Sequence, residues 1–173
     1  MTRQMALEEF SQALRQGQKE YKEFTSLNKN PHPLVLDEIL SENGNHSVVE
    51  VGLVDIPTER IVGVKSAGRI TAFSPTFLPL LDQKTEFGSK WISLCQAHLG
   101  ATGITEPILC YEYLGDFYVQ EGNKRVSVLR YFGASRIPGY VRRVMPQPSE
   151  EPRIRAYQEF LDFYKASDRK SVV

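Results

Sequence analysis

The sequence has 173 residues, of which 41% are hydrophobic, and this favours about one folded domain with a substantial core and excludes a large multidomain assembly. The 21 Lys and Arg residues balance the 21 Asp and Glu residues, so no net field attracts the chain to DNA or to an anionic membrane. A charged start without a long apolar run predicts a cytoplasmic chain that lacks a membrane span, and two cysteines are too few for a disulfide-stabilised scaffold.

Residues 1–45 predict a long amphipathic helix followed by a linker. Thr2 is a suitable N-cap, and apolar residues recur at helical spacing at Phe10, Ala13, Leu14, Gly17, Tyr21 and Phe24. The prolines of residues 28–33 prevent the helix from continuing, because each disfavours helical backbone at the residue before it. A short apolar segment at 34–40 and a turn at 41–45 then precede a region of different composition.

Residues 46–145 alternate short strands with helices. Residues 48–56 are rich in β-branched side chains and end before a proline, so they predict a strand. Residues 63–79 contain glycine, serine and proline, and they predict a long exposed loop that carries Lys65 and Arg69.

Capping residues and glycines predict two further helices inside this region. Thr85 starts one that ends near Gly100. Its apolar face consists of Phe87, Trp91, Leu94, Cys95 and His98. Asn123 starts the other helix, which ends at Gly133.

Strands and a terminal helix complete the predicted fold. The expected strands are residues 107–113, 117–120 and 137–144, and the first two form a hairpin. Ser149 caps a last helix with a strongly aromatic face. The chain therefore divides into an N-terminal helix with its linker (1–45), an α/β (α+β) domain with a small mixed sheet (46–145), and a C-terminal helix (146–173).

The most informative segment is the predicted strand-to-helix corner at residues 119–125. The first amides of a helix have no internal partners and carry the positive end of its dipole, so they can bind an anion. Gly122 lets the backbone approach a phosphate closely, and Asn123 can cap the helix or donate to a ligand. Lys124 and Arg125 place cations in the first turn, where the dipole disfavours them. In the alternative interpretation, the glycine only serves a tight turn and the cations reach into solvent.

Motifs at compatible spacing follow one another between residues 46 and 144. A strand that closes in an arginine-bearing turn occupies Val51–Arg60, and glycine followed by Pro-Ile occurs in Gly103–Ile108. Gly122–Arg125 then opens a helix that ends in Gly-Ala, and Ile137–Val141 provides a closing strand. In this order the motifs resemble the ParB/sulfiredoxin-like superfamily, which includes the N-terminal domain of chromosome-partition ParB proteins.

The resemblance implies a site for a nucleotide or another phosphorylated ligand, because members of this superfamily act as CTP-dependent switches, kinases or reductases. The matching motifs place Gly103, Thr105, Pro107, Gly122, Asn123, Lys124 and Arg125 at that site. Mg²⁺ would accompany a bound nucleotide. Sulfiredoxins carry their catalytic cysteine at the position of Asn123, so no sulfinic-acid reductase activity is expected of this chain.

Further charged residues leave alternatives open. Arg60, Lys65 and Arg69 either form a second cationic wall over a bound phosphate or belong to a solvated loop. Glu121 precedes the corner and is either a general base or metal ligand, or simply an exposed strand end. Arg125 either presents parallel donors to a phosphate or is held by Glu121 or a backbone carbonyl.

Other functions also stay open at this stage. Cys95 and His98, three residues apart on a predicted helix, offer half of a metal site, but no second close pair of ligands exists and no metal is expected. Besides nucleotide binding, with or without hydrolysis, the alternatives are a DNA-associated partition-like or nuclease-like protein and a non-catalytic interaction domain of a longer chain. The aromatic faces of the first and last helices allow a homodimer.

Overall fold

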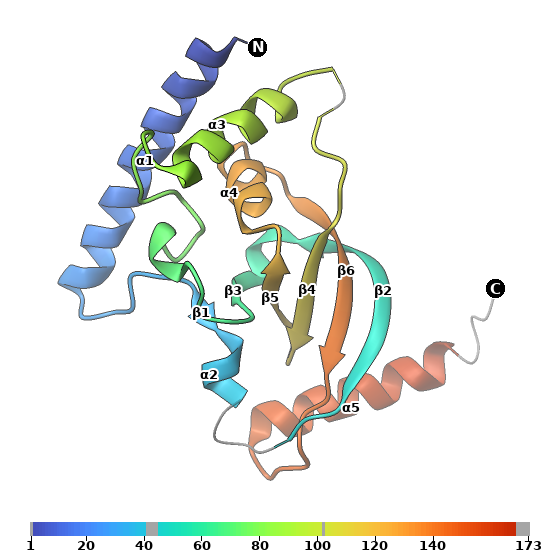
Figure 1. The fold of residues 1–173 in the computed structure, drawn as a ribbon. Helices are drawn as coiled ribbons and strands as arrows, with labels where there is room; N and C mark the ends of the chain where they lie inside the picture. Colours follow the sequence, from blue (N-terminus) through green and yellow to red (C-terminus); the bar gives the residue numbers. More distant parts are fainter. Residues whose placement is uncertain (1, 41–44, 102, 169–173) are drawn as a thin grey trace.

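A mixed sheet with helices around it makes up residues 2–40, 45–101 and 103–168, which are the residues that this computed structural model describes (Figure 1). The helices are α1 (Arg3–Ser26), α2 (Leu36–Leu40), α3 (Glu86–His98), α4 (Asn123–Tyr131) and α5 (Pro152–Asp168). The strands are β1 (Leu34–Val35), β2 (Val48–Pro57), β3 (Ile61–Val64), β4 (Ile108–Tyr113), β5 (Asp116–Glu121) and β6 (Arg136–Val144). The α/β class expected from the sequence is confirmed.

The strand order is β1-β3-β5-β4-β6-β2, which puts the β4–β5 hairpin in the middle of the sheet. β4 and β5 are antiparallel, as predicted, and Leu114 (φ 53°) and Gly115 (φ 88°) form the turn between them. Positive φ at both central residues is typical of hairpin turns whose twist matches that of the strands. β4 also pairs in parallel with β6, and β6 pairs antiparallel with the edge strand β2.

The main core joins α1, α3 and α4 to the sheet. Trp91 of α3, Val126 of α4 and Ile108 of β4 are fully buried in one hydrophobic cluster. Nε1 of Trp91 donates a 2.8 Å hydrogen bond to Oγ of Ser127, which satisfies both buried groups. Phe10 of α1 lies against Trp91, with ring centroids 5.3 Å apart, so the N-terminal helix shares the core of the sheet domain.

The last helix lies across the opposite end of the sheet from α3 and α4 (Figure 1). α5 begins at Pro152, after Oγ of Ser149 accepts a hydrogen bond from the amide of Glu151. Tyr157 and Leu161 are buried, whereas Phe160 is 49% exposed, so only part of the expected aromatic face is covered. Tyr164 also falls at helical spacing for this face, but its side chain lies outside the described residues.

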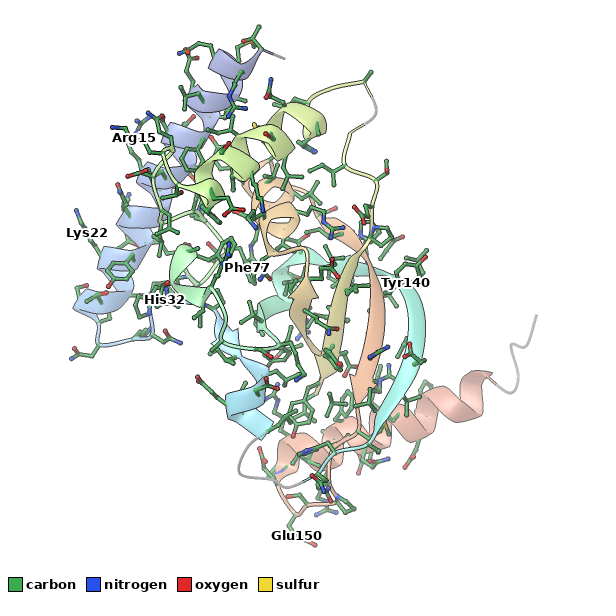
Figure 2. All side chains as sticks on the ribbon, in the orientation of Figure 1. Arg15, Lys22, His32, Phe77, Tyr140 and Glu150 are labelled. Carbon is green, nitrogen blue, oxygen red and sulfur yellow. The ribbon has the colours of Figure 1, made fainter. Side chains whose placement is uncertain are left out.

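The expectation of one exposed loop over residues 63–79 is wrong in two places. Ile61–Val64 is strand β3, which pairs with β1 and β5 inside the sheet. Gly63 is required there because an added Cβ would lie 2.2 Å from the carbonyl oxygen of Leu34, so this glycine marks close strand packing and not a loop. Phe73 and Phe77 are also buried, and Figure 2 shows Phe77 inside the molecule.

The predicted helix starts are confirmed where the caps can be seen. Oγ1 of Thr2 accepts from the amide of Met5, and Oγ1 of Thr85 accepts from the amide of Gly88. Most of the turn expected at residues 41–45 lies outside the described residues. Within the described part of the chain, none of the helices is long and apolar enough to cross a membrane.

Candidate functional site

The strand-to-helix corner has the geometry that the sequence predicts. β5 ends at Glu121, Gly122 adopts φ 107°, and α4 starts at Asn123. A side chain at position 122 would be strained by this φ, and its Cβ would lie 2.7 Å from Ile108. No side chain caps α4 and its first turn contains no acidic residue, so nothing there offsets the positive end of the helix dipole.

A cavity of about 460 Å³ opens at this corner. Its lining consists of Gly122, Asn123, Lys124 and Arg125 from the start of α4, Lys90, Ser93 and Leu94 from α3, and Glu106 from the segment before β4. Lys90 and Ser93 were not among the predicted site residues, because they lie on the polar side of α3 and the helix was predicted from its apolar side. No local sequence signal identifies Lys90, because only the packing of α3 against α4 brings it near Lys124.

Positive charge dominates the surroundings of Lys124. Burial is the main cause that lowers the pKa of Lys124, and the positive charges of Lys90 and Arg69 lower it further. Glu86 acts in the opposite direction, but this carboxylate already accepts a 2.7 Å ion pair from Nζ of Lys90. A half-buried ammonium group beside like charges favours a bound anion.

Arg125 connects the start of α4 to the segment before β4. Its Nη1 donates to the carbonyl oxygens of Glu106 (3.1 Å) and Pro107 (2.9 Å), and it lies 3.7 Å from Oε2 of Glu106. Only 13% of the side chain is exposed. These contacts are those of the alternative in which backbone carbonyls hold Arg125, although the residue also lines the cavity.

Asn123 adds a polar group to the same cavity. Its Oδ1 is buried and has no hydrogen-bond partner among the residues that the structure describes. An amide oxygen is an acceptor, so this buried atom is unsatisfied as the side chain stands.

The proposed second cationic wall is only partly assembled. Arg69 acts electrostatically on Lys124, but Lys65 forms an ion pair with Asp37 and lies 5.2 Å from the ring centroid of Tyr111. Arg60 lies 3.9 Å from Asp116 at the β4–β5 turn. Because Lys65 follows β3 directly, the chain directs it to the sheet and not to the corner.

The remaining predicted residues surround the corner without lining the cavity. Glu121 is exposed at the end of β5, and Thr105 is exposed before β4. Gly103 adopts φ 68°, and Pro107 contributes its carbonyl oxygen to the contact with Arg125. Glu121 is therefore not placed among the groups that enclose the cavity.

Both residues considered for a metal site pack against apolar or aromatic neighbours. Cys95 is fully buried, and the ring of His98 lies 5.0 Å from that of Phe132. The described ranges contain no group of three or more His, Cys, Asp or Glu side chains that could hold a metal ion.

The comparisons with family models, curated proteins and solved structures give no match to this chain. The likeness to the ParB/sulfiredoxin-like superfamily therefore depends on the motifs alone and stays a prediction. What can be argued about function depends on the chemistry of the corner.

Proposed function

We propose that this chain binds a phosphorylated small molecule, most plainly a nucleotide, at the start of α4. The observation that supports the proposal is the grouping of Lys90, Lys124 and Arg125 around one cavity at an uncapped helix start. Helices α3 and α4 supply these three cations, whereas two carboxylates, Glu86 and Glu106, lie beside them. Phosphate is the common biological anion that such a combination of amides and cations recognises.

The ligand would lie with its phosphate on the first-turn amides of α4 and beside Lys124. Its remaining part would occupy the side formed by Ser93 and Leu94. The cavity of about 460 Å³ falls within the usual range for small-molecule sites. Any Mg²⁺ would bind together with the nucleotide, and Glu106 is a carboxylate in the cavity lining that could contact it.

Binding, and not hydrolysis, is the function proposed. Glu106 is the carboxylate that lines the cavity, but it is 80% exposed and faces Arg125. A general base has to be held within hydrogen-bond reach of the proton that it removes. Glu121, the base considered from the sequence, is not part of the lining.

A thermal-shift screen with pyrophosphate, ADP, ATP and CTP, each with and without Mg²⁺, tests this proposal. At least one of these ligands should raise the melting temperature of the wild type and should raise that of Lys124→Gln much less. Lys22→Gln is the matched control, because Lys22 is exposed on α1 and Figure 2 shows it pointing away from the rest of the molecule. The control should respond as the wild type does.

Two results would contradict the proposal. One is that no phosphorylated ligand raises the melting temperature, and the other is that Lys124→Gln and Lys22→Gln respond equally. If duplex DNA binds instead, with an affinity that falls steeply with salt, the DNA-associated alternative replaces the nucleotide site.

A further inference from the structure

A second cavity, of about 620 Å³, lies between α5 and the sheet, away from the α4 corner. Apolar side chains form most of its wall: Val49, Pro57, Phe117, Met145, Phe160 and Leu161. The cavity is open to solvent, since Val49 and Phe160 in its wall are each 49% exposed. Its volume falls within the usual range for small-molecule sites.

Three polar side chains meet in the wall of this cavity. Glu112 of β4 is only 5% exposed, and both of its carboxylate oxygens lie 2.5 Å from the hydroxyl of Tyr157 on α5. Nε of Arg143 on β6 donates to Oε1 of Glu112 at 3.0 Å. The buried carboxylate therefore has charged and neutral donors from two other elements.

Arg143 brings N–H donors to this group beyond the one that Glu112 accepts. Both oxygens of Glu112 already accept, and the Tyr157 hydroxyl uses its proton on them. The Arg143 guanidinium contacts the Tyr157 hydroxyl as well as Glu112, but it carries several N–H groups and 29% of the side chain is exposed, so donors remain for a ligand. Its positive charge also approaches the Tyr157 hydroxyl and lowers the pKa of that group, against the stronger effect of burial.

We infer that this cavity is a binding site for an amphipathic acid, with the apolar body between α5 and the sheet and the carboxylate on the free N–H groups of Arg143. An anionic head complements the remaining donors and the exposed part of the guanidinium. A cationic head would meet the like charge of Arg143, and Glu112 is only 5% exposed and already contacts Arg143 and Tyr157, so amines are the less favourable charge class. The site is separate from the α4 corner, and the two proposals do not depend on each other.

Octanoate is the probe, with octanol and octylamine as comparisons of equal chain length. Titration calorimetry should detect octanoate binding, whereas octanol should bind about tenfold more weakly or worse, because a hydrogen-bonded charge contributes about 1.5–3 kcal/mol. Octylamine should not bind measurably. Equal affinities for octylamine and octanoate would overturn the assignment of an acid site.

The location can be tested in the unaltered chain through its methionines. Met145 lines the cavity, whereas Met5 is 50% exposed on α1 and serves as an internal control. In protein labelled with ¹³C at the methionine methyl groups, octanoate should shift the Met145 signal in a saturable way and leave the Met5 signal unchanged. Saturable octanoate binding without a shift at Met145 would contradict the location.

A substitution that fills the cavity gives a second test. Val49 is half-exposed and lines the cavity, so the larger side chain of Val49→Trp should occupy part of it. It should reduce octanoate affinity at least about tenfold, because the ring takes up space in which the octanoate chain would contact the cavity wall. Val51→Trp on the same strand is the control, because Val51 is 40% exposed and does not line the cavity. Equal affinity in both variants would overturn the inference.

Discussion

Arg125 shows how one side chain can contribute to both folding and binding. Its Nη1 holds two consecutive carbonyl groups of the segment before β4, and the same side chain lines the cavity at the start of α4. These hydrogen bonds hold the segment before β4, which forms one side of the cavity, in place without a ligand. A guanidinium suits this position because its planar array of donors can serve several acceptors at once.

Substitution of Arg125 should therefore affect stability as well as ligand binding. Arg125→Ala should lower the free energy of unfolding by about 1.5–3 kcal/mol, since hydrogen bonds to a charged group are lost. It should also weaken binding of any ligand found in the thermal-shift screen by about tenfold to a hundredfold. Denaturant unfolding and calorimetric titration measure the two effects.

Arg125→Lys is the informative companion to this variant. Lysine keeps the charge but cannot reproduce the fork of donors, so it should rescue neither stability nor affinity fully. If the alanine variant loses stability but retains wild-type affinity, Arg125 is structural and does not belong to the ligand site.

The two cysteines should be unreactive while the chain is folded. Burial raises the pKa of Cys95 to about 11 and that of Cys110 to about 12, from an ordinary value of 9.0. Labelling with Ellman's reagent at neutral pH should be slow in the native protein and complete at both thiols in denaturant. Fast labelling of one thiol in buffer would contradict the burial of that cysteine.

The same shifts fix the direction of a pH effect on stability. Both thiols ionise at lower pH in the unfolded chain than in the folded chain, so the folded state holds more protons above about pH 9. The contribution of the two protonated thiols to the free energy of unfolding is fully present below pH 9. It is lost as the pH rises towards 11–12.

At the scale of the elements, α5 depends on one buried polar contact. The Tyr157 hydroxyl donates to Glu112, and Arg153 in the first turn of α5 forms a 2.9 Å ion pair with Asp116 of β5. The ion pair is exposed and contributes little, whereas the Tyr157 contact is almost completely buried. Burial and the hydrogen bond to Glu112 both raise the pKa of Tyr157, so the hydroxyl stays protonated and able to donate.

Tyr157→Phe should therefore destabilise the protein by about 1–3 kcal/mol, because a buried carboxylate loses a donor. Tyr140→Phe is the matched control, since Tyr140 is 52% exposed on β6 and Figure 2 shows it at the surface. The control should change the free energy of unfolding by less than about 0.5 kcal/mol. Similar unfolding curves for the two variants would show that α5 is held by other contacts.

The accuracy of the sequence analysis also differs from element to element. The β4–β5 hairpin and the start of α4 are confirmed because local signals specify them: a turn with glycine and a glycine before a helix start. β3 was not predicted, because a glycine at position 63 indicates a loop when only the local sequence is considered. The glycine is needed because the strand that contains Leu34 lies very close, and this is a long-range contact. Lys90 was missed for the same reason, since only the packing of α3 against α4 brings it to Lys124.

Over the whole molecule the charges balance, yet at the α4 corner cations outnumber carboxylates, even though Lys90 pairs with Glu86 and Arg125 with Glu106. The formal net charge is zero, yet Lys90, Lys124, Arg125 and Arg69 lie around the same corner. A balanced total charge therefore excludes a general attraction to polyanions but not a local anion site. The homodimer allowed by the sequence stays a prediction, which light scattering after size exclusion can test.

The central claim is that the first turn of α4 binds phosphate, and amide chemical shifts test it most directly. In a titration of ¹⁵N-labelled protein with pyrophosphate and with CTP plus Mg²⁺, the backbone amides of Asn123, Lys124 and Arg125 should show the largest saturable shifts. The amide of Lys22 on α1 should not move. Saturable shifts confined to residues away from the α4 corner, or no saturable shift with either ligand, would contradict the account.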